Sequence, residues 1–332
     1  MDWLPVFFVT IMGFALLMYT ILDGYDLGIG MLLPFAEEHE KDQMIATIGP
    51  FWDANETWIV LGVGVLLMAF PHAHGVVLTS LYLPVAVMLI GLTLRGVAFD
   101  FRVKAKTQYK TTWNHLFFIG SLSASMAQGW MLGRYVMGLN DSGISLLFAV
   151  IIALLLPVLY LMLGCGWLLV KGEGELYNKA ARWAKKLILP LGLSFFIISI
   201  ATPIASDSIA ARWFSFPHIL VLLPIPIISM IAYGVILRVL TNEKLLAADY
   251  GWLVFVSLIT LCIMCALGLG YSIYPYVIIG EMTIWEAAAS RDSLMFAFYG
   301  TIIAVPGIFL YTVFIYRVFS GKTTELSYES DA

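Results

Sequence analysis

The fold is decided by the stretch Leu22-Asp23-Gly24-Tyr25-Asp26-Leu27-Gly28-Ile29-Gly30, which closes an apolar run that begins near residue 6. Asp23 and Asp26 are three residues apart, so they share one face of a helix. Gly24 and Gly28, four residues apart, point to roughly the opposite side, where they would let another helix backbone approach closely. We therefore expect a helix with acids on one face and a packing surface on the other.

The composition around this stretch is that of a membrane protein. Of the 332 residues, 61% are hydrophobic and 12% are charged, and the mean hydropathy is +0.91. A soluble domain has about 50% apolar and about 25% charged residues. These values exclude a soluble fold and argue against nucleic acid as a partner. The amino end lacks the basic region of a cleavable signal peptide, so we expect it to be retained as the first span.

A window of about 20 residues, which crosses a hydrocarbon core of about 30 Å, predicts nine membrane-spanning helices. Their limits are 6–33, 52–71, 76–98, 115–137, 144–170, 187–204, 216–239, 251–275 and 293–317. The longest connections, around 35–51, 99–114, 171–186 and 276–292, are too short to form a soluble domain. We therefore predict an all-α polytopic integral membrane protein, with residues 1–332 forming a single transmembrane helical domain.

The basic residues predict the orientation, because loops rich in Lys and Arg stay in the cytoplasm. With the amino end outside and the carboxyl end cytoplasmic, only Arg134, Arg212 and Arg291 fall in outer segments, and Arg95 lies within a span. The inner segments then hold Lys41, Arg102, Lys104, Lys106, Lys110, Lys171, Lys179, Arg182, Lys185, Lys186, Arg238, Lys244, Arg317 and Lys322.

Acidic residues gather at the cytoplasmic ends of the first three predicted spans. Asp53 and Glu56, three apart, open the second span on a common face, and we expect them to face the acids that close the first. Ionisable groups at membrane depth are costly and are functional candidates by default. Carboxylates this close cannot all be ionised in a low dielectric, so some should exchange protons. The candidate proton path comprises Asp53, Glu56, Asp23, Asp26 and Asp100, with Arg95 as the charge partner. The alternative is that Arg95 neutralises one or two acids while water wets the others.

Three stretches together resemble the signature motifs of subunit II of cytochrome bd-type quinol oxidases, including the cyanide-insensitive relatives. Besides residues 22–30, they are Gly49-Pro50-Phe51-Trp52-Asp53-Ala54-Asn55-Glu56-Thr57-Trp58 and Arg95-Gly96-Val97-Ala98-Phe99-Asp100-Phe101-Arg102. The motifs cover the first third of the chain. The remainder is similar mainly in length, span count and the stretch Ile284-Trp285-Glu286-Ala287. Many relatives have Gly where Ala54 stands, which leaves the neighbouring acid in place.

The resemblance implies a haem-free subunit with no catalytic residue of its own. It implies a haem-bearing partner, subunit I, which carries haem b and haem d types, oxidises quinol and reduces oxygen to water. The complex would be electrogenic without pumping protons, and part of its cytoplasmic proton supply would pass through subunit II, where the matching acid is Asp53. Further implied partners are small single-span subunits, lipid and quinone. The expected location is a bacterial or archaeal cytoplasmic (inner) membrane.

Cofactor binding by the chain itself is left open by the sequence. His72 and His74 lie in a short outer turn and His218 also lies near the outer surface, so they predict interfacial histidines. A bis-histidine site among them is the weaker alternative, because axial haem ligands are normally held rigidly on helices. We predict no metal site and no firmly bound cofactor, and a bound quinone stays open.

A proton-coupled secondary transporter is the alternative function. Transporters usually mark their substrate site with polar or broken helices at the bilayer midplane. Here the acids lie at one end and most spans are apolar in the middle, which favours the oxidase subunit.

Overall fold

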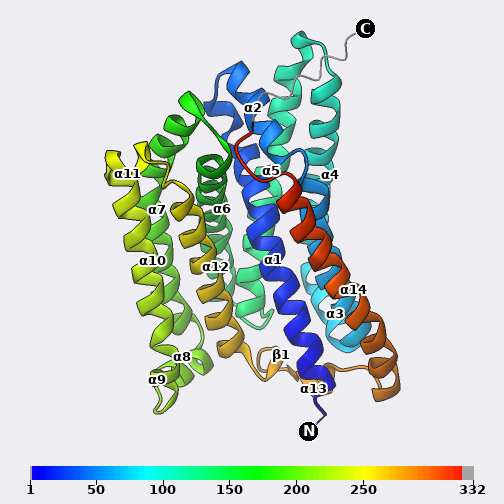
Figure 1. The fold of residues 1–332 in the computed structure, drawn as a ribbon. Coiled ribbons are helices and arrows are strands. Elements are labelled where there is room, and N and C mark those ends of the chain that lie inside the picture. The colour runs from blue at the N-terminus through cyan, green and yellow to red at the C-terminus, as the bar shows by residue number, and fades with distance from the viewer. Residues whose placement is uncertain (1, 324–332) are drawn as a thin grey trace.

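A computed structural model describes residues 2–323, and these residues form a bundle of helices with one small hairpin (Figure 1). The first half contains α1 (Leu4–Leu32), the 3-10 turn η1 (Leu33–Phe35), α2 (Glu38–Ile48), α3 (Trp52–Ala69), α4 (Pro71–Lys104), α5 (Thr107–Val136) and α6 (Gly143–Lys171). The second half contains α7 (Gly174–Ala205), α8 (Asp207–Trp213), α9 (His218–Leu222), α10 (Pro224–Thr241), α11 (Glu243–Ala247), α12 (Trp252–Ile273), β1 (Tyr276–Ile278), β2 (Met282–Thr283), α13 (Ile284–Ala287) and α14 (Arg291–Val318). The predicted all-α membrane architecture is confirmed.

Seven segments are long and apolar enough to cross a membrane, judged by length and composition within residues 2–323. They are α1 with η1, α4, α6, α7, α9 with α10, α12 and α14. The other two predicted spans, 52–71 and 115–137, coincide with α3 and α5, which are helical but more polar. Nine crossings therefore stay a prediction.

Three of the connections expected between spans are largely helical, and the one around 35–51 contains α2. Between 99 and 114 only Ala105 and Lys106 separate α4 from α5, and α7 begins at Gly174, well before the predicted start at 187. The helical residues beyond the predicted spans are polar. A hydropathy window therefore predicts a span shorter than the helix that contains it. Lys, Arg, Glu and Gln are nevertheless good helix formers, which lets the same helices continue beyond the apolar segment.

The centre of the bundle is α1, which contacts α3, α5, α6, α12 and α14. Its glycines pack against α6, as predicted: a Cβ at Gly28 would lie 1.9 Å from the carbonyl oxygen of Tyr160, and one at Gly164 would lie 2.8 Å from Gly28. The two backbones therefore touch. Because this face of α1 is occupied by α6, the acids on the other face point toward α3 and α4.

The end that carries α2 and α11 also carries the last described residues, whereas the amino end lies with α8, α9, β1 and α13 (Figure 1). Lys171, at the end of α6, donates hydrogen bonds to the carbonyl oxygens of Phe319 and Gly321, which fastens the end of α14 to α6. Lys179 binds the Glu40 carboxylate at 2.5 Å and ties α2 to α7. Burial acts to raise the pKa of Glu40, but the Lys179 ammonium and the Glu37 amide outweigh it, so that pKa lies below its usual range.

The two ends of the bundle provide a test of orientation. We expect a reporter fused after Lys322 to be active only in its cytoplasmic form and one inserted at Asn140 only in its exterior form, because the basic residues cluster at one end. Lys322 binds Asp249 beyond α11 at 2.8 Å, whereas the chain next to Asn140 packs against β1 at the other end. Activity of the same reporter form at both positions would contradict the predicted orientation.

Candidate proton-entry site

Arg95 of α4 joins two carboxylates from two other helices inside the bundle. Its Nη1 donates to Asp23 Oδ1 of α1 at 2.5 Å, and its Nη2 donates to Glu56 of α3. Asp23 and Arg95 are 0% and 1% exposed. The Glu56 side chain is 30% exposed and so reaches the surface. The predicted charge partner is therefore in contact with two of the five predicted acids.

Asp26 lies in a second network beside the first, and its hydrogen-bond partners there are neutral side chains. The amide nitrogen of Asn55, on α3, donates to Asp26 Oδ2 at 2.8 Å and to the Tyr25 hydroxyl at 2.8 Å, with a longer contact of 3.3 Å to the Leu22 carbonyl oxygen. The Tyr316 hydroxyl, from α14, donates to Asn55 Oδ1 at 3.1 Å and lies 2.5 Å from the Tyr25 hydroxyl. Residues from the first, third and last long helices thus meet around one buried carboxyl.

Asp53 and Asp100 are not brought into this cluster, because both are exposed. We expected Asp53 to share the face of Glu56 and to look toward the acids of α1. Instead Ala54, Asn55 and Trp58 fill the buried face of α3 at 4%, 0% and 0% exposure. Residues three apart on a helix are offset by about 60° at 3.6 residues per turn, which is enough to leave Asp53 outside while Glu56 reaches inward.

A third set of polar residues extends the site toward the middle of the bundle, and the sequence reasoning missed it. Tyr160 of α6 donates to Gln128 Oε1 of α5 at 2.6 Å, and Gln128 Nε2 donates to the Tyr19 hydroxyl at 2.8 Å. Tyr19 lies one turn before Asp23 on α1 and interacts with it electrostatically. The three side chains are buried, at 9% exposure or less. Gln128 was the one available signal, a polar residue within a predicted span.

The sequence matches a known family. A family model described as cytochrome bd terminal oxidase subunit II matches residues 4–319. The chain belongs to this family. It is therefore a subunit of a bd-type terminal oxidase, an oxidoreductase complex, and a membrane protein of the bacterial respiratory chain.

Curated relatives and a solved structure agree with this family. Cytochrome bd-I ubiquinol oxidase subunit 2 of Escherichia coli (strain K12) is 24% identical over 362 aligned positions, covering 95% of this chain and 94% of the relative. Cytochrome bd ubiquinol oxidase subunit 2 of Bacillus subtilis (strain 168) is 30% identical over 183, covering 51% and 54%. A chain of the bd oxidase from Geobacillus thermodenitrificans has the same fold, with a TM-score of 0.78 at 16% identity over 96% of this chain and 99% of that one.

In a bd oxidase subunit, haem and quinone are the groups to test against the residues present. Of the five histidines, His39, His72, His115 and His218 are exposed and His74 is half-buried. His218 Nδ1 lies 3.0 Å from the Ser215 hydroxyl, and His115 Nδ1 lies 2.7 Å from the Thr111 carbonyl oxygen. Axial haem ligands are normally held rigidly inside a helical core. The histidines of this chain do not fit that requirement.

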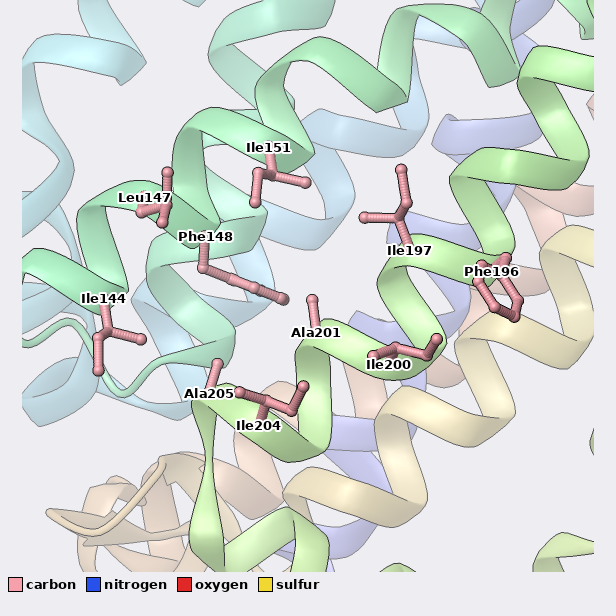
Figure 2. A pocket seen from close by; sticks show the side chains of 10 residues that line it. All are labelled: Ile144, Leu147, Phe148, Ile151, Phe196, Ile197, Ile200, Ala201, Ile204 and Ala205. Atoms are coloured by element: carbon pink, nitrogen blue, oxygen red, sulfur yellow. The ribbon is translucent and has the colours of Figure 1, made fainter.

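An apolar hollow of about 310 Å³ lies between the amino-terminal part of α6 and the carboxyl-terminal part of α7 (Figure 2). All ten side chains that line it are hydrocarbon, from Ile144 to Ile151 on α6 and from Phe196 to Ala205 on α7. A quinone ring carries two carbonyl oxygens that need donors, and a pocket that fixes a polar group normally supplies them. The lining therefore fits an acyl or isoprenoid chain and does not fit a quinone ring.

Proposed function

We propose that this chain is the haem-free subunit of a bd-type quinol oxidase and that it supplies cytoplasmic protons to the complex. The observation that carries the proposal is the group of three carboxyls around one arginine, which lies where α1, α3 and α4 meet. The haem-bearing partner would oxidise quinol and reduce oxygen to water. Membership of the oxidase family favours this function over a proton-coupled transporter.

The exposure of the acids supports a path that leads inward. Asp53 is exposed, the Glu56 side chain is 30% exposed, and Asp23 is fully buried. Asp53 and Glu56 interact electrostatically, and Glu56 and Asp23 share Arg95. Asp100 is exposed on α4. We propose that Asp53 and Asp100 collect protons at the surface and that Glu56, Asp23 and Asp26 receive them.

The proposed orientation puts this end of the bundle in the cytoplasm. The same end carries α2 and α11 (Figure 1) and the basic residues Lys41, Lys179 and Lys244. In a bacterial inner membrane, protons taken from the cytoplasm for water formation make turnover electrogenic without a pump. The exposed histidines support haem sites in the partner rather than here.

Asp53→Asn tests the proposed entry. Asn keeps the shape and the hydrogen-bonding capacity of the side chain but cannot exchange a proton. We expect the complex to assemble with an unchanged haem spectrum, while oxygen consumption slows several-fold and the membrane potential formed during quinol oxidation decreases. Asp53→Glu should retain much of both.

The matched control is Glu243→Gln, which removes an exposed acid of α11 at the same end of the bundle. It should leave the rate of oxygen consumption and the membrane potential unchanged. Failure of Asp53→Asn to assemble would assign Asp53 a structural role. Full turnover with a normal membrane potential would remove Asp53 from the path.

A further inference from the structure

We propose that, of the three carboxyls around Arg95, Asp26 is the one that carries an exchangeable proton at neutral pH. The inference deepens the proposed proton path, on which it rests for its biological role. It names the group that stores a proton inside the bundle.

The three acids differ in whether they form an ion pair with Arg95. Arg95 uses one terminal nitrogen for Asp23 and the other for Glu56. Within residues 2–323, no ion pair joins Asp26 to a cation. A carboxylate taken out of water without a paired cation is strongly disfavoured against its protonated form. One guanidinium that already serves two carboxylates therefore leaves the third to take a proton.

The hydrogen bonds around Asp26 determine which group Asn55 presents to it. The Tyr316 hydroxyl donates to Asn55 Oδ1, so the hydrogen of the short Tyr25–Tyr316 contact comes from Tyr25. Asn55 then donates one amide hydrogen back to the Tyr25 oxygen and the other to Asp26 Oδ2. This ring of donors holds the Asn55 amide in one orientation. Asp26 Oδ2 therefore receives a neutral donor, which suits the carbonyl oxygen of a protonated carboxyl.

Asp26 also lines a small hollow between helices. Asp26 is 0% exposed, and its Oδ1 has no hydrogen-bond partner among the described residues. The remaining walls of the hollow are Arg95 and the apolar side chains Ile48, Trp52, Phe99 and Phe117. The four apolar side chains do not stabilise an anion, and Arg95 already pairs with two other carboxylates, which favours a proton on Asp26.

Arg95 makes the proton on Asp26 exchangeable rather than permanent. Its Nε is buried without a partner among the described residues, as is Asp23 Oδ2, and Arg95 lines the same hollow. Loss of the proton leaves a carboxylate in the same hollow as the Arg95 guanidinium, whose positive charge acts on it. The charged and titratable groups that act on Asp26 are Asp23, Glu56, Arg95, Tyr25 and Tyr316.

Infrared spectroscopy of the assembled oxidase tests the assignment. A protonated carboxyl has a C=O stretching band that shifts in D2O, and ionised carboxylates lack this band. Labelling aspartate with 13C at the side-chain carboxyl separates its band from those of lipid esters and of glutamate. We expect Asp26→Asn to lose one such labelled band. Asp53→Asn should keep it, because Asp53 is exposed and makes no ion pair with Arg95.

A second variant covers the case in which Asp26→Asn does not assemble. Tyr316→Phe removes the hydroxyl that orients Asn55 and leaves Asp26 in place. The band should then shift in frequency without being lost. An unchanged set of labelled bands in Asp26→Asn or in Tyr316→Phe would overturn the assignment, as would loss of the band in Asp53→Asn.

The assignment and the proposed function can fail separately. Suppose that the band belongs to Asp26 but Asp26→Asn turns over at the full rate. The proton on Asp26 is then not part of the path, so the assignment stands and the role of Asp26 in proton supply is contradicted. If Asp53→Asn slows turnover but no band belongs to Asp26, the entry stands and the assignment falls.

Discussion

Replacing Arg95 by Met is expected to reduce the amount of assembled subunit to a small fraction of that of the parent protein. Removing one partner of a buried ion pair costs about 3–5 kcal/mol, because the other charge stays buried and unpaired. Asp23 is that charge, since it is fully buried, whereas the Glu56 side chain is 30% exposed and is partly solvated. The measurement is the yield and thermal stability of the detergent-solubilised complex, followed by size-exclusion chromatography.

Companion variants separate the charge effect from a general loss of packing. Arg95→Met combined with Asp23→Asn removes both charges and should recover part of the lost stability. Arg95→Lys should fall in between, because an ammonium lacks the planar fork that binds two carboxylates at once. Arg238→Met, at an exposed position of α10, is the control and should behave as the parent protein does. Equal stability of Arg95→Met and the parent would contradict a structural role for the ion pairs.

Replacing Gly28 by Ala is expected to separate α1 from α6 and to disable the acid site with it. The added Cβ would meet the Tyr160 carbonyl oxygen at 1.9 Å and the Gly164 nitrogen at 3.0 Å, and both are backbone atoms that cannot turn away. Overpacking typically costs about 1–3 kcal/mol and occasionally more. We expect a clear fall in the temperature at which the complex loses its single chromatographic peak, together with loss of turnover.

Gly13→Ala is the matched control, because it makes the same change on the same helix where no atom lies within 4 Å of the new Cβ. It should be neutral or slightly stabilising, since Gly is about 1 kcal/mol less favourable than Ala in a helix interior. A Gly28→Ala protein as stable as the Gly13→Ala protein would show that α1 and α6 tolerate separation.

The sequence predicts the helices well because hydropathy is a local property. Every predicted span coincides with a helix or, at 216–239, with the pair α9 and α10. Helix ends were predicted less well, since polar residues beyond the apolar segment continue the helix at α4, α5 and α7. The number of membrane crossings depends on the environment of α3 and α5, and composition alone does not fix it.

The acid site was predictable only in part. Three motifs bring together Asp23, Arg95 and Glu56, and spacing was enough to suggest that they meet. Spacing could not show that Asp53 turns outward, because neighbouring residues on α3 compete for the buried face. Tyr316 is 261 residues from Asn55, and no local pattern marks it as a partner. Contacts of this kind depend on how α1, α3 and α14 pack.

The contribution of Tyr316 has a consequence for biosynthesis. A chain made from its amino end inserts α1 and α3 long before α14, the last of its long helices. Until then Asn55 lacks the donor for its amide oxygen, and the Tyr25 hydroxyl lacks its acceptor. The site therefore matures only when the final helix reaches the bundle, so a nascent or truncated chain holds Asp26 in an unfinished setting. Completion of the polypeptide thus controls when the hydrogen-bond network around Asp26 is complete.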